Sequence, residues 1–261
     1  MPTNELNIAL LQYPLSWEAP HENISFFKKV ILDPSMQGSL VDLWVLPEMW
    51  STGFSMSLAR QATAIGRESL AFMIAMATQT KKAVAGSTVY EQDAQVYNRF
   101  FFVFPDGEYV YYDKRHTFSM AGESEVYHRG SSHTIIQYKG FKIFPQICYD
   151  LRFPAWSRNT HEYDLLLYVA NWPAPRIQAW DTLLKARAIE NMAFCVGVNR
   201  LGTDPNGHLY PGHSAGYDCF GNEMVFSKEE GRLLLSLNKE SLTAARAQFP
   251  FLEDRDAFDI R

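Results

Sequence analysis

The stretch FKIFPQICYDLRFP, residues 141–154, gives the clearest indication of the fold. Its first half is apolar and is typical of a buried β-strand, which we expect over residues 141–147. This strand runs into Cys148 and then into the polar loop Tyr149-Asp150-Leu151-Arg152. In α/β proteins the loops after strands are accessible while the sheet fixes their geometry, so functional residues collect there. If the chain is an α/β protein, the stretch therefore places a cysteine at a functional strand end.

The rest of the chain alternates strands with helices, which favours an α/β fold with helices covering the sheets. The predicted strands are residues 6–13, 42–46, 82–90, 96–104, 108–112, 141–147, 164–170, 194–199, 214–218, 224–226 and 232–237. The predicted helices are residues 22–32, 68–78, 176–193 and 239–247. No repeat, low-complexity tract or linker interrupts this pattern, so we expect one domain over residues 1–261.

Composition excludes several classes of protein. The chain has 261 residues, is 47% hydrophobic and carries a formal net charge of −5, which argues against a nucleic-acid binder and against disorder. No apolar run approaches the roughly 20 residues of a membrane helix, and the N-terminus does not resemble a signal peptide. We therefore expect a cytoplasmic protein without a membrane partner. Three widely spaced cysteines do not suggest a disulfide framework, and no zinc-binding spacing is present.

Two further strand ends carry polar residues. Glu48 follows the apolar run Leu43–Leu46, and a carboxylate in such surroundings can act as a base near neutral pH. Lys114 lies in the segment Asp113-Lys114-Arg115-His116 after a predicted hairpin strand, where an ammonium could stabilise negative charge on a reacting carbonyl. Taken singly, Glu48 could be a surface acid and Lys114 part of a solvated turn.

Cys148 has the same ambiguity when it is considered alone. A thiol becomes a strong nucleophile beside a base or a cation, whereas most free cysteines are buried and inert. Cys195, inside an apolar strand, and Cys219, in a turn, fit the inert description better. Glu48, Lys114 and Cys148 together supply a base, a cation and a nucleophile.

With this combination the chain resembles the nitrilase superfamily, also called the carbon–nitrogen hydrolases. The matching segments are Pro47-Glu48, Asp113–His116 and Cys148-Tyr149-Asp150-x-Arg152-Phe153-Pro154. The form of the cysteine segment, with Asn171-Trp172-Pro173, is similar to the ω-amidase branch. One departure is Ala155-Trp156, where many members place a glutamate after the proline.

The resemblance implies an α-β-β-α sandwich, a homodimer or higher homo-oligomer, and no metal or organic cofactor. It also implies a second active-site glutamate, for which Glu123 and Glu125 are candidates and the spacing to Gly130 favours Glu123. The expected reaction cleaves a small ω-amide, such as 2-oxoglutaramate or 2-oxosuccinamate, to a dicarboxylate and ammonia through a cysteine thioester.

Substrate-binding residues are harder to predict. Phe118, Tyr149 and Trp172 could form the wall of a small pocket, with the Tyr149 backbone N–H as an oxyanion donor. A substrate carboxylate would need a cation, for which Arg152, Arg176 and His116 are candidates. Arg152 could instead hold the cysteine loop by pairing with a carboxylate.

Several other functions stay open on the sequence alone. Deaminated glutathione and N-carbamoyl compounds are alternative substrates. A catalytically inactive binding protein on the same fold would tolerate the loss of Glu48, Lys114 or Cys148, but all three residues are present. A thiol redox protein would need a resolving cysteine, and the next cysteine after Cys148 is Cys195.

Overall fold

The computed structural model describes residues 4–36 and 38–260. Its strands are β1 (Glu5–Gln12), β2 (Leu43–Val45), β3 (Ala83–Gln92), β4 (Gln95–Val103), β5 (Tyr109–Asp113), β6 (Ile136–Tyr138), β7 (Phe141–Ile147), β8 (Leu165–Ala170), β9 (Phe194–Asn199), β10 (Leu201–Thr203), β11 (Leu209–Pro211), β12 (Ser214–Tyr217), β13 (Glu223–Ser227) and β14 (Gly231–Asn238). The α-helices are α1 (Pro20–Ile31), α2 (Ala62–Thr80), α3 (Glu123–Val126), α4 (Pro154–Ser157), α5 (Ile177–Asn191) and α6 (Lys239–Gln248). Within the described ranges, no helix is both long and apolar enough to cross a membrane.

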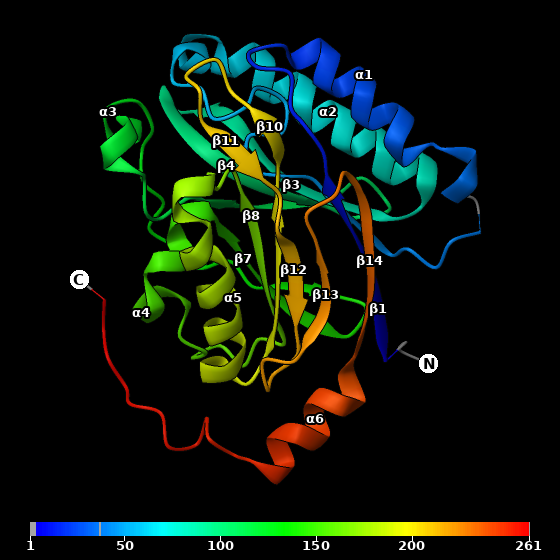
Figure 1. Cartoon of the computed structure of the whole chain (residues 1–261), viewed down its shortest axis with the longest axis vertical. Coiled ribbons are helices and arrows are strands. Elements are labelled where there is room, and N and C mark those ends of the chain that lie inside the picture. The colour runs from blue at the N-terminus through cyan, green and yellow to red at the C-terminus, as the bar shows by residue number, and fades with distance from the viewer. Residues whose placement is uncertain (1–3, 37, 261) are drawn as a thin grey trace.

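The strands form two six-stranded sheets and one small ribbon (Figure 1). The first sheet has the order β14-β1-β2-β3-β4-β5, and the second has the order β13-β12-β9-β8-β7-β6. The ribbon pairs β10 with β11.

Side-chain alternation along the strands divides the core into layers. Between the sheets, Ile8 and Phe100 of the first sheet belong to the same buried cluster as Ile143 and Leu165 of the second. On the outer face of the first sheet, residues such as Leu11 and Phe101 pack with apolar side chains of α1 and α2, among them Phe27 and Met73. On the outer face of the second sheet, Phe144 and Leu166 pack with Trp180 and Leu184 of α5. This α-β-β-α arrangement confirms the predicted fold.

Most predicted elements are present, and β7 and β9 have the predicted bounds. Helix α2 begins at Ala62, earlier than the predicted residue 68. Gly66 lies inside this helix, where a Cβ would come within 2.6 Å of the Val89 carbonyl oxygen on β3. The close approach of the helix to β3 therefore requires glycine at this position. The short elements α3, α4, β6, β10 and β11 were not predicted.

The directions of the strands place the glutamate, lysine and cysteine segments at the carboxyl ends of strands. Strands β1, β2 and β3 are parallel, and β5 runs with β3 because both are antiparallel to β4. In the second sheet β7, β8 and β9 are parallel. Glu48, Lys114 and Cys148 therefore all follow the carboxyl ends of strands, two from one sheet and one from the other.

Candidate active site

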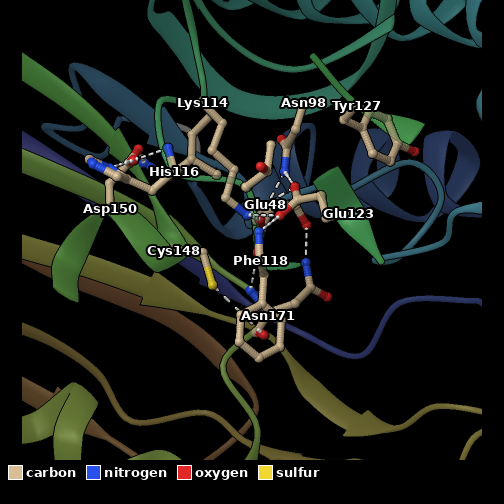
Figure 2. Close-up of polar contacts among 12 residues, drawn as sticks. Glu48, Asn98, Lys114, His116, Phe118, Glu123, Tyr127, Cys148, Asp150 and Asn171 are labelled. Atoms are coloured by element: carbon tan, nitrogen blue, oxygen red, sulfur yellow. Dashed lines mark hydrogen bonds and ion pairs between the residues drawn. The ribbon is translucent and has the colours of Figure 1, made fainter. Parts of the chain in front are cut away.

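Lys114 lies at the centre of a buried ionic cluster (Figure 2). Its Nζ is 2.8 Å from Glu48 Oε1 and 3.0 Å from each carboxylate oxygen of Glu123. The Asn98 side-chain amide donates to Glu48 Oε1 at 2.9 Å and to Glu123 Oε1 at 3.2 Å. One ammonium and one amide therefore hold two carboxylates in fixed positions. Glu123 is the buried member of the predicted glutamate pair, whereas Glu125 is exposed.

Asn171, at the end of β8, connects this cluster to the second sheet. Its backbone N–H donates to Glu48 Oε2 at 2.8 Å, and its side-chain Nδ2 donates to the Glu48 carbonyl oxygen at 2.6 Å. Both oxygens of the Glu48 carboxylate are thus occupied by donors from other segments of the chain. The carboxylate has a single well-defined orientation as a result.

Cys148 follows β7 in a strained conformation. Its φ of 45° lies in the left-handed region, which costs a non-glycine residue on the order of 1–3 kcal/mol unless surrounding structure enforces it. The residue is partly exposed, and its Sγ lies 4.0 Å from the Asn171 carbonyl oxygen (Figure 2). This backbone conformation directs the sulfur away from β7 and toward Asn171, which follows β8.

Burial and opposing charges set the protonation of the cluster. Burial disfavours the Lys114 ammonium, but the Glu123 and Glu48 carboxylates outweigh it and raise the pKa of Lys114 above its ordinary value. Burial and the Glu48 carboxylate raise the pKa of the Cys148 thiol well above its ordinary value, and the Lys114 ammonium opposes them only in part. Burial also raises the pKa of Glu123 despite the Lys114 charge. These shifts favour a neutral thiol beside a charged lysine.

The cluster opens onto a cavity of about 810 Å³, a size typical of small-molecule sites. Five of the predicted substrate-binding residues lie in its wall, namely Phe118, Tyr149, Arg152, Trp172 and Arg176. Glu48, Lys114 and Cys148 are also part of the wall. The predicted residue His116 is not among the lining residues, and its Nδ1 lies 2.8 Å from Asp150 Oδ1.

The two arginines are held by aromatic rings. The Arg176 guanidinium lies 4.9 Å from the Phe118 ring centroid, and that of Arg152 lies 5.3 Å from the Trp172 ring centroid. No side chain in the described ranges forms an ion pair with either arginine. The alternative that Arg152 holds the cysteine loop by pairing with a carboxylate is thus not seen among the described residues.

The sequence analysis did not identify several residues of the site. Asn98 is a buried amide near the middle of β4, directly before the buried Arg99 and the apolar run Phe100–Val103, and no motif marked it. Asn171 appeared in the motif comparison but was assigned no role. The remaining wall includes Trp17 and Glu18 after β1, and Asp204, His208 and Tyr210 around the β10–β11 ribbon. These lie in segments without a recognisable motif.

A thiol, a buried carboxylate and a buried ammonium at the strand ends of such a sandwich are typical of a cysteine-dependent hydrolase. Residues 7–246 match the carbon-nitrogen hydrolase family. The chain belongs to this family, as the motifs predicted, and is a carbon–nitrogen hydrolase.

Individual relatives match over nearly the whole chain. The omega-amidase YafV of Yersinia enterocolitica is 43% identical, over 97% of this chain and 98% of its own length. The 2-oxoglutaramate amidase of Bacillus subtilis (strain 168) is 32% identical, over 95% of this chain and 96% of its own. XC1258 from Xanthomonas campestris, a CN-hydrolase superfamily protein of known crystal structure, is 35% identical in sequence. The two structures superimpose with a TM-score of 0.94 over 98% of this chain and 99% of the XC1258 chain.

Proposed function

We propose that this enzyme is an ω-amidase, which hydrolyses the terminal amide of small dicarboxylic acid monoamides such as 2-oxoglutaramate or 2-oxosuccinamate. The observation that carries the proposal is the position of Lys114 between Glu48 and Glu123, in a cavity whose wall also contains Cys148 and two arginines. The relatives named omega-amidase and 2-oxoglutaramate amidase support the substrate class.

The first half of the reaction forms a thioester. Because burial and the Glu48 charge raise the pKa of Cys148 and so favour its thiol form, the Glu48 carboxylate takes the thiol proton as Sγ attacks the amide carbonyl. Lys114 and the backbone N–H of Tyr149 stabilise the resulting oxyanion, and loss of one such donor typically costs about 3–4 kcal/mol of transition-state stabilisation. The protonated Glu48 returns its proton to the leaving nitrogen, and ammonia departs.

The second half of the reaction consumes one water molecule. Glu48, again a carboxylate, takes a proton from the water as its oxygen attacks the thioester carbonyl. The C–S bond breaks, the carboxylic acid leaves, and Cys148 recovers its proton. Glu123 orients Lys114 throughout, because both of its carboxylate oxygens contact the lysine Nζ.

The substrate carboxylate binds at the arginine side of the cavity. Arg176 and Arg152 carry guanidinium groups that bind carboxylates through paired hydrogen bonds, and the aromatic rings beside them limit their movement. A monoamide with its carboxylate at the arginines then presents its other end to Cys148. Because the positive charges lie at one side of the cavity and the nucleophile at the other, the site favours ω-amides that carry an acid group over neutral amides.

Ammonia release from purified protein tests the reaction. The wild type should release ammonia from 2-oxoglutaramate, and Cys148→Ala should reduce release to the background rate. Glu48→Gln should lower kcat by roughly 10²–10⁴-fold because the general base is lost. Undiminished release by a folded Cys148→Ala protein would contradict the mechanism. A preference for a nitrile, an N-carbamoyl compound or deaminated glutathione in the same assay would contradict the substrate class.

Substitution of the arginines tests the substrate orientation. Arg176→Met and Arg152→Met should each raise KM for 2-oxoglutaramate by about 10-fold or more, because a hydrogen bond to a charged group contributes about 1.5–3 kcal/mol. KM for propionamide, which has no carboxylate, should stay unchanged, and Arg60→Met, at an exposed residue before α2, should affect neither substrate. Equal effects on the two substrates would mean that the arginines do not bind the carboxylate.

Assembly and location are further parts of the proposal. We expect a homodimer or a higher homo-oligomer, which sedimentation velocity of the purified chain would measure. The expected cytoplasmic location is tested by cell fractionation with an antibody to the native chain.

A further inference from the structure

Asp150 connects the cysteine segment to the lysine segment from a fully buried position. Its Oδ2 accepts the Ile147 backbone N–H at 3.0 Å and the Tyr112 hydroxyl at 2.9 Å. Its Oδ1 accepts the His116 backbone N–H at 2.9 Å and lies 2.8 Å from His116 Nδ1 (Figure 2). Four groups therefore converge on one carboxylate.

The direction of these hydrogen bonds follows from the chemistry of the partners. The Tyr112 oxygen accepts N–H donors from Arg115 at 3.2 Å and from the Trp156 indole at 3.0 Å, so its own hydrogen must point to Asp150. Burial and the Asp150 charge raise the pKa of Tyr112 well above its ordinary value, which keeps the hydroxyl as a donor. An ionised carboxylate can only accept hydrogen bonds, so in the tautomer that makes this contact His116 Nδ1 carries the hydrogen and donates it to Asp150.

The four donors flank the two catalytic segments. Tyr112 and His116 lie two residues before and two residues after Lys114, and Ile147 directly precedes Cys148. These segments belong to different sheets, since Lys114 follows β5 and Cys148 follows β7. The His116 ring is held in place by stacking on Phe153, with ring centroids 3.8 Å apart and planes 8° apart.

We propose that the His116–Asp150 pair sets the position of Cys148 relative to Lys114, so that His116 is a positioning residue and does not bind substrate. The proposal rests on Cys148 as the nucleophile. The strained backbone of Cys148 needs surrounding contacts to enforce it, and Asp150 supplies one through the preceding N–H. The absence of His116 from the cavity wall agrees with an indirect role.

Three substitutions of His116 separate positioning from substrate binding. His116→Ala should lower kcat by about 10- to 100-fold, a loss typical of a misplaced catalytic group, and should leave KM for 2-oxoglutaramate unchanged. His116→Asn, whose amide N–H can take the place of Nδ1–H, should restore most of kcat. His116→Gln, whose amide reaches the position of Nε2 instead, should not.

Alkylation gives a readout that does not depend on substrate. Because Cys195 and Cys219 are buried, iodoacetamide should react at Cys148, and Cys148→Ala should be unreactive. The alkylation rate should fall in His116→Ala and recover in His116→Asn. His21→Ala is the matched control, since His21 also contacts a carboxylate, at 2.8 Å from Glu68, but lies on the exposed face of α1.

The outcomes are distinguishable. A raised KM with normal kcat in His116→Ala would assign His116 to substrate binding and overturn the proposal, as would failure of His116→Asn to restore kcat above His116→Gln. If His116→Ala does not fold, Tyr112→Phe, which removes another donor to Asp150, should lower kcat at unchanged KM, and normal kcat would overturn the proposal. Activity in Cys148→Ala would instead contradict the proposed nucleophile, whatever the His116 variants do.

Discussion

At the scale of single residues, the site depends on one cation shared by two acids. Lys114 is buried and contacts both Glu48 and Glu123, so neither carboxylate is left without a counter-charge. Removing one partner of a buried ion pair typically costs about 3–5 kcal/mol, because the other charge stays buried alone. Lys114 is therefore needed for the stability of the site as well as for its chemistry.

The thiol of Cys148 should respond to the charge of Glu48. Since the Glu48 carboxylate helps to raise the pKa of Cys148, Glu48→Gln removes a negative charge and favours the thiolate. The midpoint of the iodoacetamide alkylation rate against pH should then shift to lower pH relative to the wild type. Glu125→Gln, at an exposed glutamate, should leave the midpoint in place. A midpoint that stays or rises in Glu48→Gln would contradict the charge coupling.

Single residues could be predicted from the sequence where a motif marked them and could not where tertiary contacts define them. Glu48, Lys114 and Cys148 each follow a recognisable strand segment. Asn98 and Asn171 contact Glu48 across 50 and 123 residues of chain, and no local pattern encodes such pairs. His116 was a predicted ligand of the substrate carboxylate, but its Nδ1 lies 2.8 Å from Asp150 Oδ1, on a segment that follows the other sheet's strand β7.

At the scale of elements, the end of β5 is fixed by the close approach of another segment. Gly130 donates its backbone N–H to the Lys114 carbonyl oxygen at 2.9 Å. A Cβ at residue 130 would lie 2.1 Å from the Asp113 carbonyl oxygen, which is a backbone atom and cannot move independently of the strand. Glycine is therefore required for the contact that holds the backbone of Lys114.

Gly130→Ala should consequently damage both stability and turnover. We expect the free energy of unfolding, measured in urea, to fall by about 1–3 kcal/mol and kcat for ammonia release to fall with it, because β5 must shift to admit the methyl group. Gly216→Ala is the control: it brings the new methyl group against the tip of the Leu235 side chain on β14, so it should cost stability without lowering kcat. Normal kcat in a folded Gly130→Ala protein would show that the contact does not position Lys114.

The sequence predicted the longer strands and, among the three-residue strands, β2, which lies in the apolar run Leu43–Leu46. Strands such as β7 and β8 show several residues of one pattern, whereas the three-residue strands β10 and β11 are too short for any periodicity to be recognised. The start of α2 was misplaced because Gly66 lowers helix propensity locally, while its contact with β3 stabilises the helix through packing that a sequence window does not contain.

At the scale of the whole molecule, strand–helix alternation indicated only an α/β protein, and the sandwich was predicted from family resemblance. What joins the sheets is a set of contacts between distant segments, as in the cluster of Ile8, Phe100, Ile143 and Leu165. Polar contacts also join the sheets, and Gln12 at the end of β1 makes several of them. The pairing of sheets is a property of the folded chain that no single segment carries.

Gln12 is fully buried and links the first sheet to three positions in or beside the second. Its Oε1 accepts the Ser214 N–H at 2.8 Å, and its Nε2 donates to the carbonyl oxygens of Ser227 and Glu229 at 3.1 Å and 2.7 Å. Gln12→Leu keeps a side chain of similar length but leaves these backbone groups without their partner, so the free energy of unfolding in urea should fall by about 1–3 kcal/mol. Gln137→Leu, at an exposed glutamine on β6, should change it by less than about 0.5 kcal/mol. Equal stability of the two variants would mean that water replaces the lost hydrogen bonds and that apolar packing alone joins the sheets at this edge.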